Sequence, residues 1–89
     1  MRTIFKYPIA MLERTTLHIP KGAKLLCVAE QNGAWFLWAE IDTSKLPTKR
    51  EIVIVGTGQP MLKDAAMWYI GTIHTSGGYV WHVFEELPE

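Results

Sequence analysis

The sequence has a single cysteine, no long apolar run and no targeting segment. Because Cys27 stands alone, no disulfide can form within the chain, and a reducing compartment is expected. The longest apolar run, residues 34–39, is far below the roughly 18–20 residues that a membrane-spanning helix needs. Residues 1–10 lack the apolar core and the small-residue cleavage site of a signal peptide. We therefore expect a cytoplasmic protein with no membrane partner.

The chain also has no excess of either charge. Nine basic side chains balance nine acidic ones, so the formal net charge is zero. The lysines and arginines are spread along the chain, which argues against nucleic acid as a partner, because backbone binding needs a basic stripe. This argument does not exclude a local basic patch. A neutral chain does not repel its own copies, and self-association becomes easier.

What the sequence does contain is typical of one small β domain spanning residues 1–89. Apolar residues make up 48 % of the chain and charged residues 20 %, as in globular proteins. Turn-forming residues recur at short intervals, and the runs between them are rich in β-branched and aromatic residues. We expect an all-β fold, either a small barrel or a sandwich, of six or seven mostly antiparallel strands with one short helix.

The expected elements follow from these intervals. Strands are predicted at residues 2–7, 16–19, 24–30, 34–41, 51–55, 69–74 and 79–85. Residues 60–68 have helical character, because Pro60 suits the first turn of a helix and Leu62, Ala65 and Ala66 favour its continuation. A loop with a single turn is the alternative for this segment.

Asn32–Gly33 is the strongest local signal. Both central residues of a type I′ turn need positive φ, which asparagine and glycine tolerate. A two-residue loop then sets the register of the hairpin. It pairs Gln31 with Ala34, Glu30 with Trp35, Ala29 with Phe36, Val28 with Leu37, and Cys27 with Trp38.

Both faces of this predicted hairpin, residues 24–41, are apolar. One face carries Leu26, Val28, Trp35, Leu37, Ala39 and Ile41. The other carries Leu25, Cys27, Ala29, Phe36 and Trp38. A hairpin in a two-layer protein normally has one polar face, so either the fold covers both sides or one side meets another molecule. The candidate interface residues are Trp35, Phe36, Trp38 and, from the last strand, Trp81.

A second hairpin is predicted around Gly77–Gly78. If these glycines form a two-residue turn, His74 lies opposite Trp81, Ile73 opposite His82, and Gly71 opposite Phe84. Gly71 would then be a place where an aromatic ring lies over a bare backbone.

Residue types that carry catalysis or bind metals are scattered. His18, His74 and His82 lie on three separate predicted strands, whereas a zinc site needs three or four converging ligands. Cys27 is expected to be a buried small apolar residue, where its thiol would be inert. No serine occurs in a nucleophile-elbow motif. We expect neither an enzyme nor a bound metal or cofactor.

The segment Gly56, Thr57, Gly58 and Gln59 is the candidate ligand-binding loop. It leaves an apolar strand and enters the possible helix at Pro60, so its backbone N–H groups could approach an anion. It matches neither the P-loop pattern nor the dinucleotide-binding fingerprint. A purely structural turn is the alternative.

Seven segments together resemble a family of small single-domain proteins of tailed bacteriophages and prophages, a domain of unknown function that ends in His-Val-Phe-Glu. They are IFKYP (4–8), IPKGAKLL (19–26), QNG (31–33), LWA (37–39), VGTGQP (55–60), YIGT (69–72) and VWHVFE (80–85). The resemblance implies an accessory phage protein of the bacterial cytoplasm. It also implies that relatives often carry histidine where this chain has Gln59.

The sequence thus predicts a non-enzymatic binding module. An apolar aromatic face would meet a second copy, most simply in a dimer, or a host protein. The alternative is a protein that binds a small anionic or nucleotide ligand beside residues 56–59, with an aromatic ring stacked on it.

Overall fold

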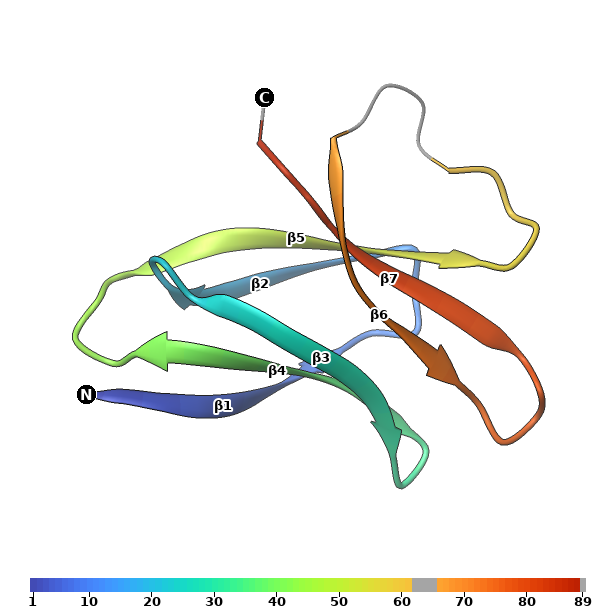
Figure 1. Cartoon of the computed structure of the whole chain (residues 1–89), viewed down its shortest axis with the longest axis horizontal. Helices are drawn as coiled ribbons and strands as arrows, with labels where there is room; N and C mark the ends of the chain where they lie inside the picture. Colours follow the sequence, from blue (N-terminus) through green and yellow to red (C-terminus); the bar gives the residue numbers. More distant parts are fainter. Residues whose placement is uncertain (62–65, 89) are drawn as a thin grey trace.

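The computed structural model describes residues 1–61 and 66–88, and every regular element in them is a β-strand (Figure 1). The strands are β1 (Arg2–Ile9), β2 (Arg14–Pro20), β3 (Lys24–Gln31), β4 (Ala34–Asp42), β5 (Pro47–Gly56), β6 (Met67–His74) and β7 (Val80–Glu86). The expected all-β class is confirmed.

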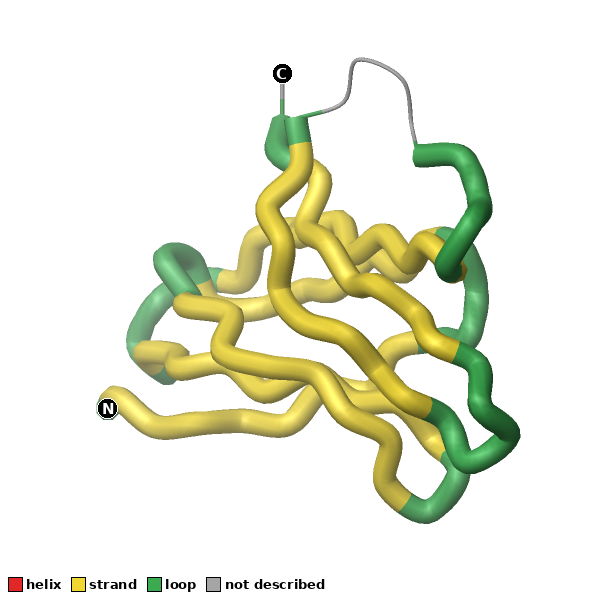
Figure 2. The backbone as a smooth tube through the Cα atoms, turned by 45° about the vertical axis from the view of Figure 1, so that its right-hand side comes forward, coloured by secondary structure: helices red, strands yellow, loops and turns green. Residues whose placement is uncertain are grey.

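The strands form two antiparallel sheets rather than a closed barrel. One sheet has the order β1-β4-β3 and the other has the order β2-β5-β7-β6. Their edge strands β3 and β6 run side by side, and both hairpin turns lie at the same end of the molecule (Figures 1 and 2). Gly71 of β6 approaches Val28 of β3 so closely that a Cβ on Gly71 would lie 3.0 Å from the Val28 Cγ2 atom.

The apolar core fills the space between the sheets. Its largest fully buried members are Ile19, Leu37, Ile52, Ile73 and Val83, which come from five different strands. Burying a side chain of this kind stabilises a fold by about 1.5–3 kcal/mol. The core therefore depends on contacts between segments that are far apart in the chain.

The first hairpin has the predicted turn and the predicted register. Asn32 and Gly33 have φ angles of 52° and 80°, and Cys27 lies opposite Trp38. One detail was wrong: a β-bulge between Leu25 and Cys27 exchanges the faces of Leu25 and Leu26. Leu25 packs against the core, and Leu26 is 38 % exposed.

The second hairpin differs from its prediction. His74 pairs with Val80, Ile73 with Trp81, and Thr72 with His82. The connecting loop holds five residues, because the Thr75 N–H donates to the Tyr79 carbonyl, at 3.0 Å, and the Gly78 N–H donates to the Thr75 carbonyl, at 3.1 Å. A bulge between Tyr69 and Gly71 shifts the register again, so Phe84 faces Tyr69 instead of Gly71.

Several strand boundaries also differ from the prediction. The largest difference is at β5, which begins at Pro47, four residues before the predicted strand, because pairing with β2 continues to Pro20 opposite Pro47. Of the predicted helix at residues 60–68, residues 62–65 lie outside the described part of the chain, and Met67 and Trp68 already belong to β6. The described segments contain no helix of the length and apolarity needed to cross a bilayer.

Candidate functional site

The outer face of the β1-β4-β3 sheet carries an apolar surface, which we call the outer aromatic face. Its members are Ile4 and Pro8 of β1, Leu26, Cys27 and Ala29 of β3, and Phe36 and Trp38 of β4. At its centre the rings of Phe36 and Trp38 meet edge to face, with centroids 6.3 Å apart. Both side chains are half-buried, and within the described residues no third layer packs on this face.

Lys6 lies among these apolar side chains. It pairs with Trp38 across the strands, and its ammonium stands 4.5 Å from the centroid of the Phe36 ring. The same ammonium donates a hydrogen bond to the Gln31 side-chain oxygen, at 3.2 Å. A cation over an aromatic ring is attracted by the ring quadrupole, which holds the Lys6 ammonium over the face of Phe36. The edges of the Phe36 ring and the aliphatic part of the Lys6 side chain remain available to a partner.

Three sequence expectations about single residues need correction. Trp35 is 4 % exposed and belongs to the core, so it leaves the set of candidate interface residues. Trp81 is partly buried and packs on Trp35, with ring centroids 5.7 Å apart, so it supports the core from the opposite sheet. Cys27 is exposed on the outer aromatic face and is not buried. Of the predicted interface residues, only Phe36 and Trp38 share this surface.

The loop at Gly56–Gln59 is a closed turn in which most donors already have partners. The Gly56 N–H donates to the Gln59 side-chain oxygen, at 2.9 Å, and the Gln59 N–H donates to the Gly56 carbonyl, at 3.0 Å. The Thr57 N–H donates to the Val80 carbonyl, at 3.3 Å. Three of the four N–H groups of Gly56, Thr57, Gly58 and Gln59 are thus used internally, which disfavours the expected anion cradle.

Gln59 has a clear structural role in this turn. β2 reaches β5 only as far as Arg14, opposite Val53, and the Ile54 N–H still finds the Glu13 carbonyl, at 2.9 Å. Two residues further along β5, where β2 no longer pairs with it, the Gly56 N–H donates its hydrogen bond to the Gln59 side-chain oxygen instead of to a neighbouring strand. Gly56 also lies under an aromatic ring, since a Cβ there would be 2.9 Å from Trp81 Cζ3.

A groove of about 570 Å³ opens beside this turn, between it and the second hairpin. Tyr79 and Trp81 line the groove together with the glycine turn. Arg14 is the basic residue lining the adjacent hollow, and its guanidinium is already paired with Glu86, at 2.7 Å, and with Glu51, at 3.4 Å. The groove is therefore aromatic and lacks a free cation among the described residues that line it.

A short polar chain runs over the outer face of the other sheet. The His82 ring nitrogens lie 2.9 Å from the Thr57 hydroxyl and 3.3 Å from the Thr72 hydroxyl, which in turn contacts the Tyr69 hydroxyl. His18 and His74 are exposed on other strands and do not join this chain. Within the described residues, no group of three or more His, Cys, Asp or Glu side chains is placed to bind a metal ion.

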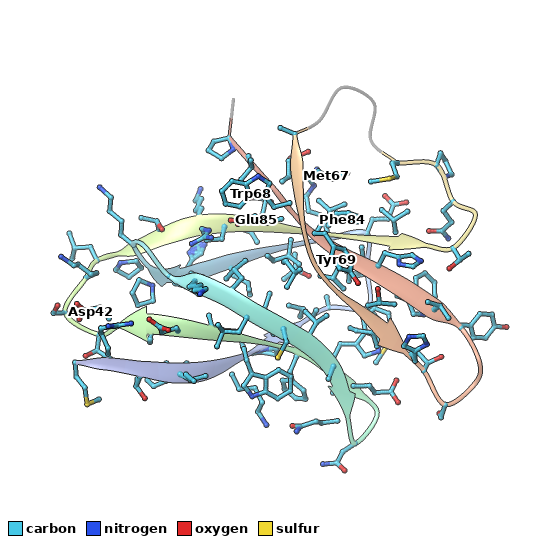
Figure 3. The ribbon with its side chains drawn as sticks, in the orientation of Figure 1. Asp42, Met67, Trp68, Tyr69, Phe84 and Glu85 are labelled. Atoms are coloured by element: carbon cyan, nitrogen blue, oxygen red, sulfur yellow. The ribbon has the colours of Figure 1, made fainter. Side chains whose placement is uncertain are left out.

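Sequence reasoning missed Trp68 and Tyr69 at the start of β6. Their side chains are 65 % and 59 % exposed, and Figure 3 shows them beside Glu85 and Phe84 of β7. The Tyr69 and Phe84 rings meet edge to face at 5.6 Å. A helix was expected over Trp68, and this expectation concealed a strand that presents two consecutive aromatic residues at the surface.

Glu85 lies opposite Trp68 in the sheet and is 5 % exposed. Its two carboxylate oxygens accept hydrogen bonds from Nε and Nη2 of Arg50, the latter at 2.9 Å. Arg50 also donates from Nη1 to the Ala23 carbonyl, at 2.9 Å. The hydrogen bond from Arg50 to Glu85 is the main reason that the pKa of Arg50 is raised above its ordinary value.

Comparisons with known proteins add a family but no activity. A search of curated proteins and a search of solved structures found no match. A family model matches the chain over residues 1–89. The chain therefore belongs to the family described as a domain of unknown function, DUF7352.

Proposed function

We propose that this protein is a non-enzymatic binding module that associates with a second copy through the outer aromatic face. The observation that carries the proposal is the half-buried edge-to-face pair of Phe36 and Trp38, with apolar neighbours on both flanking strands. Ile4 is 57 % exposed on one flank, and Leu26 is 38 % exposed on the other. Exposure of apolar surface of this kind to water is unfavourable, and covering it lowers the free energy.

The charge of the chain supports a second copy as the occupant. The formal net charge is zero, so two copies meet without long-range repulsion. A host protein is the other partner that fits an aromatic face, since aromatic residues are enriched where proteins bind one another. The two occupants give different results in the same experiment.

The test is native mass spectrometry of the purified protein beside its Trp38→Asp variant. We expect a dimer for the natural chain and a dimer weakened by at least about thirtyfold for the variant, because a central tryptophan is a typical binding hot spot. The matched control is Tyr79→Asp, which changes an aromatic residue that is 69 % exposed on the second hairpin and should leave the dimer intact.

Melting temperatures show whether the variants remain folded. A Trp38→Asp protein that unfolds would assign Trp38 to the core and contradict the proposal. A natural chain that stays monomeric at high concentration would also contradict self-association. In that case, capture of one defined host protein that is lost in Trp38→Asp would redirect the same face to a different occupant.

A second candidate function is the binding of a small ligand in the groove beside Gly56–Gln59. The aromatic lining by Tyr79 and Trp81 favours it, since planar ligands stack on such rings. Extra mass of a few hundred daltons, retained on the protein in the native spectrum, is the signature expected of this function. It is distinct from a change in the number of chains.

We also propose a setting for this function, an accessory protein of tailed bacteriophages or prophages that acts in the bacterial cytoplasm. The support is the resemblance of the seven sequence segments, which extend over nearly the whole chain. Neighbouring genes that encode phage structural or replication proteins are expected, and their absence around the gene would contradict the setting.

A further inference from the structure

Four lysines gather at the end of the sandwich where two turns meet. Lys21 and Lys24 flank the turn between β2 and β3, and Lys45 and Lys49 lie in or just after the turn between β4 and β5. The turns are joined by the Lys21 N–H, which donates to the Leu46 carbonyl at 2.8 Å. These lysines are spread along the sequence, where they form no basic cluster. The fold brings them together at one end.

Among the described residues, none of these four lysines forms an ion pair. In the described part of the chain, the cations that pair with carboxylates are the amino terminus, Arg2, Arg14 and Arg50. Glu40 lies opposite Lys24 in the sheet, but its carboxylate is paired with Arg2. This end of the sandwich, with Lys21, Lys24, Lys45 and Lys49, is here called the lysine end. It therefore presents free positive charge on a chain whose formal net charge is zero.

Trp68 stands between two hollows beside these lysines. One, of about 330 Å³, is lined by Lys24 and the preceding Gly22–Ala23 turn, and the other, of about 460 Å³, is lined by Lys49. Both hollows also include Arg50, Trp68 and Glu85. Trp68 therefore lines two hollows that each also contain a lysine, and proteins combine aromatic rings with basic residues to bind bases and phosphates together.

The two hollows differ in their acidic residues. Glu51, Glu85 and Glu86 all line the larger hollow. Among the described residues, Glu85 is the only carboxylate that lines the smaller one, and both of its oxygens are bound to Arg50. The smaller hollow therefore favours an anion, with Lys24 as its free cation. Tyr69 lines the same hollow and supplies a second exposed ring.

We propose that Trp68 and Lys24 form a binding site for a nucleotide unit. The base stacks on the exposed indole of Trp68, and the phosphate lies in the smaller hollow near Lys24. Any base can stack on tryptophan, and a lysine ammonium binds phosphate as a point charge. The site would therefore bind nucleotides in general, without preference for a particular base. A free nucleotide and a single strand of nucleic acid both supply this chemistry.

This site does not include Phe36 or Trp38 of the outer aromatic face, and it shares no residue with the groove beside Gly56–Gln59. It goes beyond self-association, and either proposal can fail while the other holds. Trp68 is 65 % exposed, so its replacement removes ring surface without opening the core.

The test measures binding to three probes at low salt: fluorescein-labelled oligothymidylate, labelled oligouridylate, and a mononucleotide such as ATP. Fluorescence anisotropy follows the two oligonucleotides. Chemical shifts of the four tryptophan indole N–H groups follow ATP, with the Trp68 signal assigned from Trp68→Phe. A free-nucleotide site binds ATP as tightly as either oligonucleotide, whereas a single-strand site binds the oligonucleotides more tightly.

Variants assign the binding to residues. Trp68→Ala should weaken binding about tenfold or more, and Trp68→Phe should retain most of it, because stacking needs only an aromatic ring. Lys24→Ala should weaken binding and reduce its salt dependence by about one phosphate contact. The matched controls are Phe5→Ala and Arg2→Ala, an exposed aromatic residue and an exposed cation of β1 in the other sheet, and both should bind as the natural chain does.

The proposal is overturned if none of the three probes binds at low salt. It is also overturned if Trp68→Ala binds as well as the natural chain while its indole spectrum shows a folded protein. Loss of binding in Trp38→Ala, with Trp68→Ala unaffected, would place the nucleotide on the outer aromatic face and equally reject the site proposed here.

Discussion

At the residue scale, three donors converge on one carboxylate oxygen at the end of β4. The Ser44 hydroxyl donates to Asp42 Oδ1 at 2.7 Å, the Ser44 N–H at 3.0 Å and the amino terminus of Met1 at 3.3 Å (Figure 3 labels Asp42). These contacts, with the Ser44 hydroxyl first, lower the pKa of Asp42 from 3.8 to about 2. Asp42, which is partly buried, thereby links the first residue of the chain to the turn before β5.

The lowered pKa predicts how this link responds to acid. Because the folded pKa lies below the unfolded one, ionised Asp42 stabilises the fold fully above about pH 4, and this stabilisation disappears as the pH falls through about 2. We expect an NMR titration of the Asp42 carboxyl to have a midpoint near pH 2 in the natural chain. The Ser44→Ala variant should have a clearly higher midpoint.

The control for this titration is Thr43→Ala, which removes a neighbouring hydroxyl that bonds to the Met1 carbonyl and not to Asp42. An unchanged midpoint in Ser44→Ala would show that the hydroxyl of Ser44 is not the main cause of the shift. Asp42→Asn should melt at a lower temperature than the natural chain near neutral pH, with the difference vanishing below pH 2.

At the element scale, the two hairpins show how far sequence patterns reach. Asn32–Gly33 sets turn type and register together, because few other residues accept positive φ at both central positions, and the prediction was confirmed. The bulge at Leu26 gave no signal, since Leu25 and Leu26 are both apolar and either one can face the core. Gly77–Gly78 suggested a two-residue turn, but hydrogen bonds of Thr75 widen the loop to five residues.

The candidate sites were harder to predict than the elements, for a related reason. Trp35 and Trp38 lie three residues apart on opposite faces of an apolar hairpin, so the sequence pattern does not indicate which one is buried. Lys24, Arg50 and Trp68 share a hollow only because β3, β5 and β6 meet there. Contacts between segments far apart in the sequence determine both which tryptophan is buried and which residues line the hollow. Local sequence patterns do not reveal such contacts.

Gly71 is the position where the meeting of β3 and β6 can be tested. A Cβ on Gly71 would lie 3.0 Å from Val28 Cγ2, and the φ angle of Gly71 is not positive, so alanine is opposed by packing alone. Overpacking of this kind typically costs about 1–3 kcal/mol, and we expect Gly71→Ala to lose that much free energy of unfolding in chemical denaturation. Gly77→Ala, whose added Cβ finds only an ordinary contact at 3.6 Å, should change stability by less than about 0.5 kcal/mol.

A double variant isolates the contact itself. Val28→Ala removes the methyl group that the new Cβ would strike, so Gly71→Ala should cost less in that background than in the natural chain. Equal costs in the two backgrounds would mean that β3 and β6 are not packed as closely as the structure has them.

At the scale of the whole molecule, Arg50 joins the two sheets at the lysine end. Its guanidinium binds Glu85 of β7 within its own sheet, and it also binds the Ala23 carbonyl, where the chain crosses from β2 into β3 of the other sheet. Glu85 is 5 % exposed, so its carboxylate depends on this partner. No backbone ladder connects the sheets in the described residues, which makes such side-chain links important for holding them together.

Removing one partner should therefore cost much more than removing both. Arg50→Met leaves a buried carboxylate without its cation, and we expect it to lose about 3–5 kcal/mol of unfolding free energy near neutral pH. Arg50→Met combined with Glu85→Leu replaces both charges by apolar groups of similar size and should regain much of that loss. Arg2→Met breaks an ion pair whose arginine side chain is 74 % exposed, and this control should cost no more than about 1 kcal/mol. Both variants lack the hydrogen bond to Ala23, but only Arg50→Met contains an unpaired buried carboxylate. A double variant as unstable as Arg50→Met would therefore show that Arg50 stabilises the fold through its bond to Ala23 and not by neutralising Glu85.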